Sequence, residues 1–263
     1  MSTSEENPVL YVVKDGVAHI TLNRPERRNA ISIAVANRLH ELWSIVDEDP
    51  EVRVVVLDAV DCGVFCAGMD LKESAQLREK EGKDLLTLME DPFFERMRTI
   101  RKPVIAALTG HFTAAGMMIA MHADLRVALQ GTTGGIAEVK RGRGTAFSPP
   151  LIWMMGLPMA MEMVLTGEPL PVERLREVGF INHIEADTAA VREKAFSLAR
   201  CIAENAPLSV YAGKKTLMTA LDVGCDEGLR LAKEIHTVVY ESRDAQEGPL
   251  AFSEKRKPRW TGT

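Results

Sequence analysis

The run Val104-Ile-Ala-Ala-Leu108 opens the segment that decides the fold class. It is short, apolar and preceded by Pro103, and the apolar stretch Ala114–Met121 behind it predicts a helix. A second strand-like run, Leu125-Arg-Val-Ala-Leu129, follows directly. Short apolar runs without polar alternation are typical of strands covered on both faces. A strand, a helix and another strand in this order predict an α/β fold.

Further elements are predicted toward the N-terminus. Val52-Arg-Val-Val-Val-Leu57 is another compact β-branched run and predicts a buried strand. Residues 9–23 predict a hairpin, because Lys14-Asp15-Gly16 separates two apolar-rich runs. Ser32 is the expected N-cap of a helix that ends before Pro50.

The predicted secondary structure changes toward the C-terminus. Phe180-Ile-Asn-His-Ile184 predicts a last short strand, and only helical patterns follow Asp187. We therefore divide the chain into a core over residues 1–190, which would carry the functional site, and a helical region over residues 191–263. The helices are expected at 189–205, 208–221, 227–241 and from 245 onward.

Composition excludes several classes of protein. The chain is 46% hydrophobic and 26% charged, as in ordinary globular proteins, and its net charge of −5 gives no reason to expect a nucleic-acid partner. No apolar run is long enough to predict a membrane span. The polar, acidic start resembles neither a secretory signal nor a transit peptide. The four cysteines have no CxxC spacing, so we expect reduced thiols, no metal site and a cytoplasmic protein.

Four stretches, in this order along the chain, resemble segments of the crotonase (enoyl-CoA hydratase/isomerase) superfamily. The resemblance implies a spiral of repeated ββα units and a C-terminal helical region that trimerises, so we expect a homotrimer or a hexamer. The stretches are Ile20-Thr-Leu-Asn-Arg-Pro-Glu-Arg-Arg-Asn-Ala30, Phe65-Cys-Ala-Gly-Met-Asp-Leu-Lys72, Lys102–Gly110 continuing to Arg126, and Glu247–Arg256.

The resemblance also implies an acyl-CoA thioester as substrate, with coenzyme A as part of that substrate and no separate cofactor. Two backbone amides, those of Met69 and Ala115, would stabilise the negative charge of a thioester enolate. Without the resemblance, the first amide would lie in a plain strand-to-helix turn and the second on a core helix. The residues expected along the coenzyme A channel are Arg28, Ala67, Asp70, Leu71 and Lys72, with Lys255 reaching the nucleotide of a neighbouring subunit.

The number of catalytic glutamates distinguishes the hydratases from the isomerases of the family. Hydratases of the family use two glutamates, and the corresponding positions here are Met118, which cannot titrate, and Glu138. The family's isomerases keep only the later glutamate, so we predict a double-bond shift with Glu138 as the single acid and base. Two alternatives stay open: a hydratase that recruits another group, such as His111, and a non-catalytic acyl-CoA binder. Glu138 is alternatively a surface residue paired with Lys140 or Arg141.

The acyl pocket is expected to include Met118 and Trp153, because methionine fits irregular apolar shapes. The alternative is that these side chains simply pack in the core. Arg141 and Arg143 either reach a polar acyl group or form a surface turn. The family's glycine-rich run is replaced by Thr113-Ala114-Ala115-Gly116. We expect the Cβ of Ala115 to narrow the backbone freedom there.

Overall fold

Two sheets organise the chain, and the computed structural model describes them within residues 7–263, apart from the side chains of Phe94 and Glu95. The acidic start, residues 1–6, lies outside the described residues. The larger sheet has the order β1-β2-β3-β5-β7-β10 and the smaller one β4-β6-β8-β9. The strands are β1 Val9–Lys14, β2 Val17–Leu22, β3 Val54–Ala59, β4 Val64–Cys66, β5 Val104–Leu108, β6 His111–Thr113, β7 Leu125–Leu129, β8 Thr133–Gly135, β9 Leu170–Pro171 and β10 His183–Glu185.

The predicted N-terminal hairpin is confirmed. β1 and β2 pair antiparallel from Val9 with Leu22 to Lys14 with Val17. Asp15 and Gly16 make the turn with positive φ angles of 51° and 79°. Asp-Gly is a preferred pair for such a turn, because both residues tolerate the left-handed region.

A repeated unit builds the rest of the core. Each of three successive units gives one strand to the large sheet and the next strand to the small sheet, before a helical segment begins. Neighbouring units pair in parallel in both sheets. The units are β3-β4-α3, β5-β6-α5 and β7-β8-η3, with α3 at Leu71–Glu81, α5 at Ala115–His122 and the 3-10 turn η3 at Glu138–Arg141.

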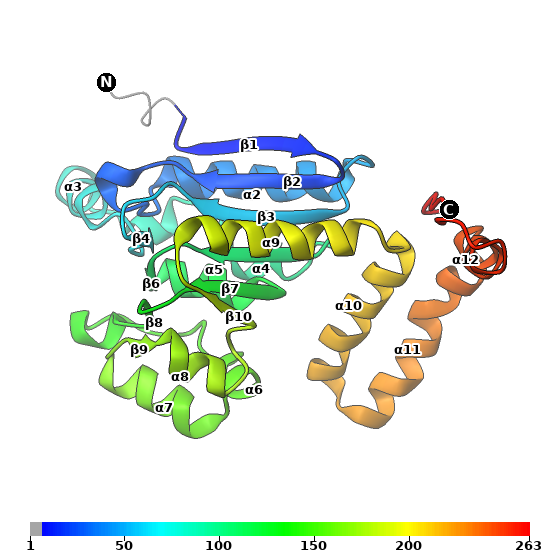
Figure 1. Cartoon of the computed structure of the whole chain (residues 1–263). Coiled ribbons are helices and arrows are strands. Elements are labelled where there is room, and N and C mark those ends of the chain that lie inside the picture. The colour runs from blue at the N-terminus through cyan, green and yellow to red at the C-terminus, as the bar shows by residue number, and fades with distance from the viewer. Residues whose placement is uncertain (1–6) are drawn as a thin grey trace.

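Helices cover both faces of the large sheet (Figure 1). On one face lies α2, Ile33–Glu48, whose predicted cap is confirmed because the Ser32 hydroxyl accepts from the Val35 amide at 3.2 Å. Its Trp43 is fully buried and donates to the Pro92 carbonyl at 2.7 Å. On the other face α9, Thr188–Ala203, packs Val191, Ala195 and Ala199 against the strands.

The remaining helices lead to the C-terminus. Figure 1 shows α10 and α11 as a hairpin that projects away from the sheets, with α12 beyond it. The predicted division between residues 190 and 191 falls inside α9, which covers the sheet, and the projecting part begins with α10. No helix within residues 7–263 is long and apolar enough to cross a membrane. The other elements are η1 Pro25–Arg27, η2 Leu85–Thr87, α4 Phe94–Met97, α6 Leu151–Met155, α7 Leu157–Thr166, α8 Val172–Glu177, α10 Pro207–Val223, α11 Cys225–Tyr240 and α12 Asp244–Ser253.

The last strand begins later than the sequence suggests. Residues 183–185 form β10, whereas Phe180 and Ile181 lie before the strand as buried core residues. The Asn182 side chain accepts from the Arg126 amide at 2.8 Å, and the Asn182 amide donates to the Arg126 carbonyl at 3.0 Å. The apolar character of the first two residues therefore reflects burial in a loop.

Candidate active site

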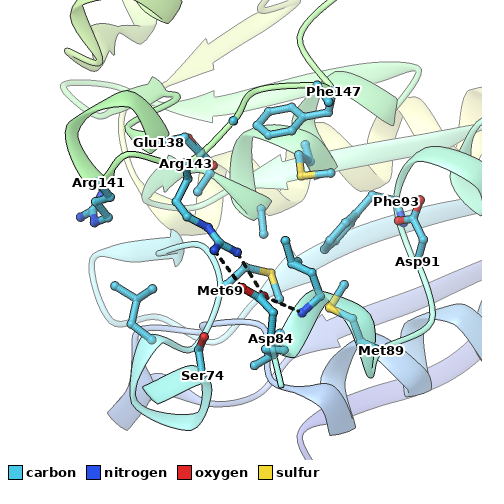
Figure 2. Close-up of a pocket in the computed structure, with 18 of the residues that line it drawn as sticks. Met69, Ser74, Asp84, Met89, Asp91, Phe93, Glu138, Arg141, Arg143 and Phe147 are labelled. Carbon is cyan, nitrogen blue, oxygen red and sulfur yellow. Dashed lines mark hydrogen bonds and ion pairs between the residues drawn. The ribbon is translucent and has the colours of Figure 1, made fainter. Parts of the chain in front are cut away.

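A cavity of about 1000 Å³ lies beside the small sheet, where strands β4 and β6 lead into their helices. Two of its walls come from residues that follow those strands, a third from η3 and the loop after it, and a fourth from the segment between α3 and α4. Its lining is mainly apolar, with a few charged side chains (Figure 2). Such a combination is typical of a ligand site.

Three predicted functional residues meet in this cavity: Met69, Ala115 and Glu138. Each follows the small-sheet strand of one repeated unit within three residues, after β4, β6 and β8 respectively. Because these three strands pair side by side, the fold brings together residues that are far apart in the chain. The repeat itself therefore assembles the site.

The Met69 amide is available to a ligand. The chain from Gly68 to Asp70 pairs with Ile31: the Ile31 amide donates to the Gly68 carbonyl and the Asp70 amide donates to the Ile31 carbonyl, both at 2.8 Å. Successive peptide groups of an extended chain point to opposite sides. The Met69 amide thus points away from Ile31, on the side of the cavity that Met69 lines.

The Ala115 amide belongs to the first residue of α5. The first amides of a helix have no acceptor within the helix and favour negative charge. A Cβ added to Gly68 would lie 3.8 Å from the Ala115 nitrogen, so the two loops are in contact at this point. The strained residue is Ala114, with φ 52° and ψ −115°, and not Ala115, which has helical geometry. The backbone restriction expected at Ala115 therefore falls one residue earlier.

Glu138 is half-buried at the start of η3 and lines the cavity. Its Oε2 atom is buried and has no hydrogen-bond partner within the described part of the chain. Burial raises the pKa of this carboxyl, against the lowering effect of its own amide and that of Ala137. The alternative pairing with neighbouring cations is not what the structure shows, because Lys140 pairs with Glu168 and Arg141 donates to the Ala137 carbonyl.

Met118 lies one helical turn after Ala115 and lines the same cavity, so the position that the resemblance aligns with a hydratase glutamate carries an apolar side chain here. Aromatic and aliphatic side chains that the sequence did not single out complete the apolar wall. They come from the segment before α4 and the loop after η3, which show no simple periodicity. These residues are Leu85, Leu86, Met89, Phe93 and Phe147.

Two other predicted residues lie outside this cavity. Trp153, expected in the acyl pocket, is 61% exposed on α6 and does not line it. His111, the alternative catalytic group, is exposed, and its Nδ1 lies 2.9 Å from the Thr133 hydroxyl. Neither side chain lines the cavity that Met69 and Ala115 share.

The residues expected along the coenzyme A channel occupy different environments. Ala67 and Leu71 line the cavity, and Lys72 is exposed nearby on α3. Asp70 is buried, caps α3 by accepting from the amides of Lys72 and Glu73, and pairs with Arg24 at 2.9 Å.

The other two residues expected along the channel do not line the cavity, although one of them is hydrogen-bonded to a residue that does. Arg28 has a left-handed backbone, and its carbonyl accepts from the Ala67 amide. Lys255 is exposed just after α12, and Figure 1 shows α12 at the opposite side of the molecule from α3.

A charged cluster in the cavity lining joins Arg143, which the sequence singled out, to Asp84 and Arg78, which it did not. Asp84 accepts two hydrogen bonds from Arg143, at 2.8 and 3.1 Å, and one from Arg78 at 2.8 Å. Hydrogen bonds from Arg143 and the Leu86 amide lower the pKa of Asp84 to about 2. Among residues 7–263, no group of three His, Cys, Asp or Glu side chains has the arrangement to hold a metal ion.

Comparison with known proteins identifies the family. The sequence profile described as Enoyl-CoA hydratase/isomerase matches residues 13–263. The chain belongs to the enoyl-CoA hydratase/isomerase family. It is 33% identical over 259 residues to the (E)-benzylidenesuccinyl-CoA hydratase of Thauera aromatica, covering 97% of this chain and 99% of that protein. It is also 33% identical to enoyl-CoA hydratase EchA19 of Mycobacterium tuberculosis, over 99% of both chains.

Solved structures agree with this assignment. An enoyl-CoA hydratase from Mycobacterium tuberculosis superposes with a TM-score of 0.86 at 37% identity, over 97% of this chain and 99% of that one. An enoyl-CoA hydratase from Bacillus anthracis superposes with a TM-score of 0.91 at 27% identity, over 98% and 100%. The predicted crotonase fold, a spiral of ββα units followed by a helical region, is confirmed.

Proposed function

We propose that this protein binds an acyl-CoA thioester with its carbonyl oxygen between the amides of Met69 and Ala115, and moves a proton with Glu138. The observation that carries this proposal is the position of the Glu138 Oε2, buried and without a partner among the described residues, in the cavity that both amide-bearing residues line. Preorganised donors stabilise charge that develops in the transition state, and each is worth roughly 3–4 kcal/mol in enzymes where it was removed. A carboxylate with a raised pKa is a stronger base for a carbon-bound proton.

The favoured reaction is a double-bond shift. Glu138 takes a proton from one carbon of the enoyl chain, the electrons flow to the thioester oxygen, and the resulting dienolate is protonated by the same carboxyl at the other carbon. One carboxyl completes this cycle without water. The side chain of Met118 supports this assignment, because it fills the second glutamate's position with a group that neither binds nor activates a proton.

Hydration is the second candidate. It is favoured by the relatives' names, because the (E)-benzylidenesuccinyl-CoA hydratase and EchA19 are both called hydratases. The first name also describes a bulky acyl group with an aromatic ring. A cavity of about 1000 Å³ with Phe93 and Phe147 in its wall is large enough to accept such a group.

The test compares α-proton exchange in deuterated water with hydration and double-bond shift. The panel contains crotonyl-CoA, a 3-enoyl-CoA and (E)-benzylidenesuccinyl-CoA. We expect exchange with the unmodified protein and a loss of about 10²–10⁴-fold in Glu138→Gln. A matched control is Glu168→Gln, which breaks the ion pair with Lys140 on the same turn. Unchanged exchange in Glu138→Gln would contradict the catalytic role, and tight binding without any exchange would identify a non-catalytic binder.

We also propose self-association through the C-terminal helices, as a homotrimer or hexamer. The support is a set of exposed large apolar side chains on the projecting helices, since such surfaces typically mark contacts with other chains. Sedimentation should give a mass of three or six chains, and a monomer at micromolar concentration would contradict the proposal. The exposed apolar side chains of these helices are Leu217, Leu221, Leu229, Val238, Tyr240, Leu250 and Phe252.

A cytoplasmic location stays a prediction.

A further inference from the structure

An ion pair spans the cavity from wall to wall. Asp84 lies between α3 and α4, Arg143 lies in the loop after η3, and both line the cavity. The guanidinium donates two hydrogen bonds to the carboxylate, in the planar paired geometry that makes arginine–carboxylate contacts strong and directional. Asp84 is fixed in turn by Arg78 and by the Leu86 amide. Arg143 is therefore held by Asp84, whose own position is fixed by Arg78 and the Leu86 amide.

The same arginine is tied to the turn that carries Glu138. The Arg143 amide donates to the Glu138 carbonyl at 3.0 Å, which closes the end of η3. Figure 2 shows the Arg143 side chain leaving its backbone close to Glu138 and extending toward Asp84, where the dashed lines mark its bonds. The catalytic turn is thus anchored to the opposite wall through one side chain.

The charges around Glu138 are nearly all matched. Lys140, on the turn, pairs with Glu168, and Glu162 on the neighbouring α7 pairs with Arg174. Arg141 contacts a backbone carbonyl, and its charge lowers the pKa of Glu138 only against the larger raising effect of burial. The other charged residues of the cavity lining are Arg78, Glu79, Asp84, Asp91 and Arg143.

Arg143 is a second cation close in sequence to Glu138, and, unlike Arg141, it is held by a carboxylate across the cavity. It is five residues after Glu138, it is a permanent cation, and its flexible side chain is 43% exposed. If Asp84 did not hold it, its guanidinium would have the buried, unpartnered Glu138 Oε2 as an acceptor within the same cavity. An ion pair there would stabilise the ionised carboxylate and weaken it as a base.

We infer that Asp84 is a positioning residue for Glu138: by holding Arg143 against the far wall, it anchors the catalytic turn and keeps a cation away from the catalytic carboxylate. This inference rests on the proposed role of Glu138. It assigns to Asp84 a contribution to proton transfer without contact between Asp84 and the reacting atoms.

The test measures the pH profile of α-proton exchange in Asp84→Asn. We expect the acid limb of kcat/KM to move down by about one pH unit or more, because the released Arg143 stabilises ionised Glu138. The plateau should fall at least tenfold, because the paired carboxylate is a weaker base. Asp84→Glu, which keeps the charge, should leave the acid limb in place. The Glu168→Gln variant, which breaks a pair on the same turn but outside the cavity, serves as the matched control.

The double variant separates electrostatics from folding. In Asp84→Asn with Arg143→Met the cation that loses its partner is Arg78, which lies on α3 and not on the turn of Glu138, so the acid limb should return to its original position. Arg143→Met alone, which leaves Asp84 intact, should lower the plateau without moving the limb. An unmoved limb in Asp84→Asn, or a double variant displaced as far as the single one, would overturn the inference. Full exchange in Glu138→Gln would instead overturn the proposed function, so the two failures are distinct.

Discussion

Gly68 and Ala114 are in direct contact where the two amide-bearing loops meet. A Cβ atom added to Gly68 would lie 2.8 Å from the Cβ of Ala114, closer than such atoms pack. Gly68 also has a φ of 102°, which side chains with a Cβ rarely adopt. The separation of the two donors therefore depends on the absence of a side chain at Gly68.

Gly68→Ala is expected to push the Met69 amide out of place. The rate of α-proton exchange should fall at least tenfold, toward the roughly 10²–10³-fold loss seen when one such donor is removed. The matched control is Gly63→Ala. Gly63 also has a positive φ, of 76°, but its added Cβ would meet nothing within 4 Å. This control should lose stability with exchange largely retained, and equal losses of exchange in both variants would contradict the steric argument.

Ala114→Gly is expected to stabilise the protein. Ala114 has φ 52° and ψ −115°, a conformation that costs roughly 1–3 kcal/mol for a residue with a Cβ. Glycine removes that strain, but it destabilises the folded state by about 0.4–1 kcal/mol because it increases the conformational entropy of the unfolded chain. Thermal unfolding should show a Tm about 2–4 °C higher, the shift expected for about 1 kcal/mol in a chain of this size. Ala120→Gly, inside α5, should lower the Tm, and an equal decrease in both variants would argue against strain at Ala114.

The pH dependence of exchange should report Glu138. Burial raises its pKa above the ordinary value of about 4.3. Proton abstraction needs the ionised form, so kcat/KM should rise with pH through a midpoint above that value and then level off. The same raised pKa costs stability as pH rises through it, because the folded state favours the protonated form. A profile with its midpoint at or below 4.3 would show that another group is the base.

Met118→Glu is expected to place a second carboxylate in the cavity. The rate of crotonyl-CoA hydration, measured as the loss of enoyl absorbance, should increase at least tenfold relative to the unmodified chain. This increase is within the range of a positioned acid or base. Met118→Gln has the same size without the titratable group and should give no increase. A gain in both variants would show that polarity at this position, and not proton transfer, limits hydration.

The sequence predicts the strands and helices that hold the site because their signals are local. Asp15-Gly16 predicts the hairpin, Ser32 predicts the start of α2, and the apolar run at 104–108 predicts the central strand β5. The three-residue strands β4, β6 and β8 are too short for any periodicity to show. Their partners are neighbours in the sheet and not in the chain.

The site is predicted less completely, and the reasons are physical. The pairing of Asp84 with Arg143 joins residues 59 positions apart and follows only from the fold. Asp70 had a local signal for its structural role, because it stands directly before a helix with Glu73 three positions later. Trp153 has an apolar side chain, but hydrophobicity alone does not say whether it faces a cavity or solvent.

The arrangement of successive units on parallel strands has a consequence for how such a protein changes its chemistry. Neighbouring strands of a sheet are about 4.8 Å apart, and main-chain hydrogen bonding alone sets that spacing. The anion stabilisation that we propose is thus a property of the scaffold, insulated from most substitutions other than those at Gly68. The positions that decide proton handling are single residues, Met118 on α5 and Glu138 on η3, and each is replaceable on its own. Substitutions at those two positions, in nature or in the laboratory, can therefore replace one reaction by another while the thioester is still bound in the same way.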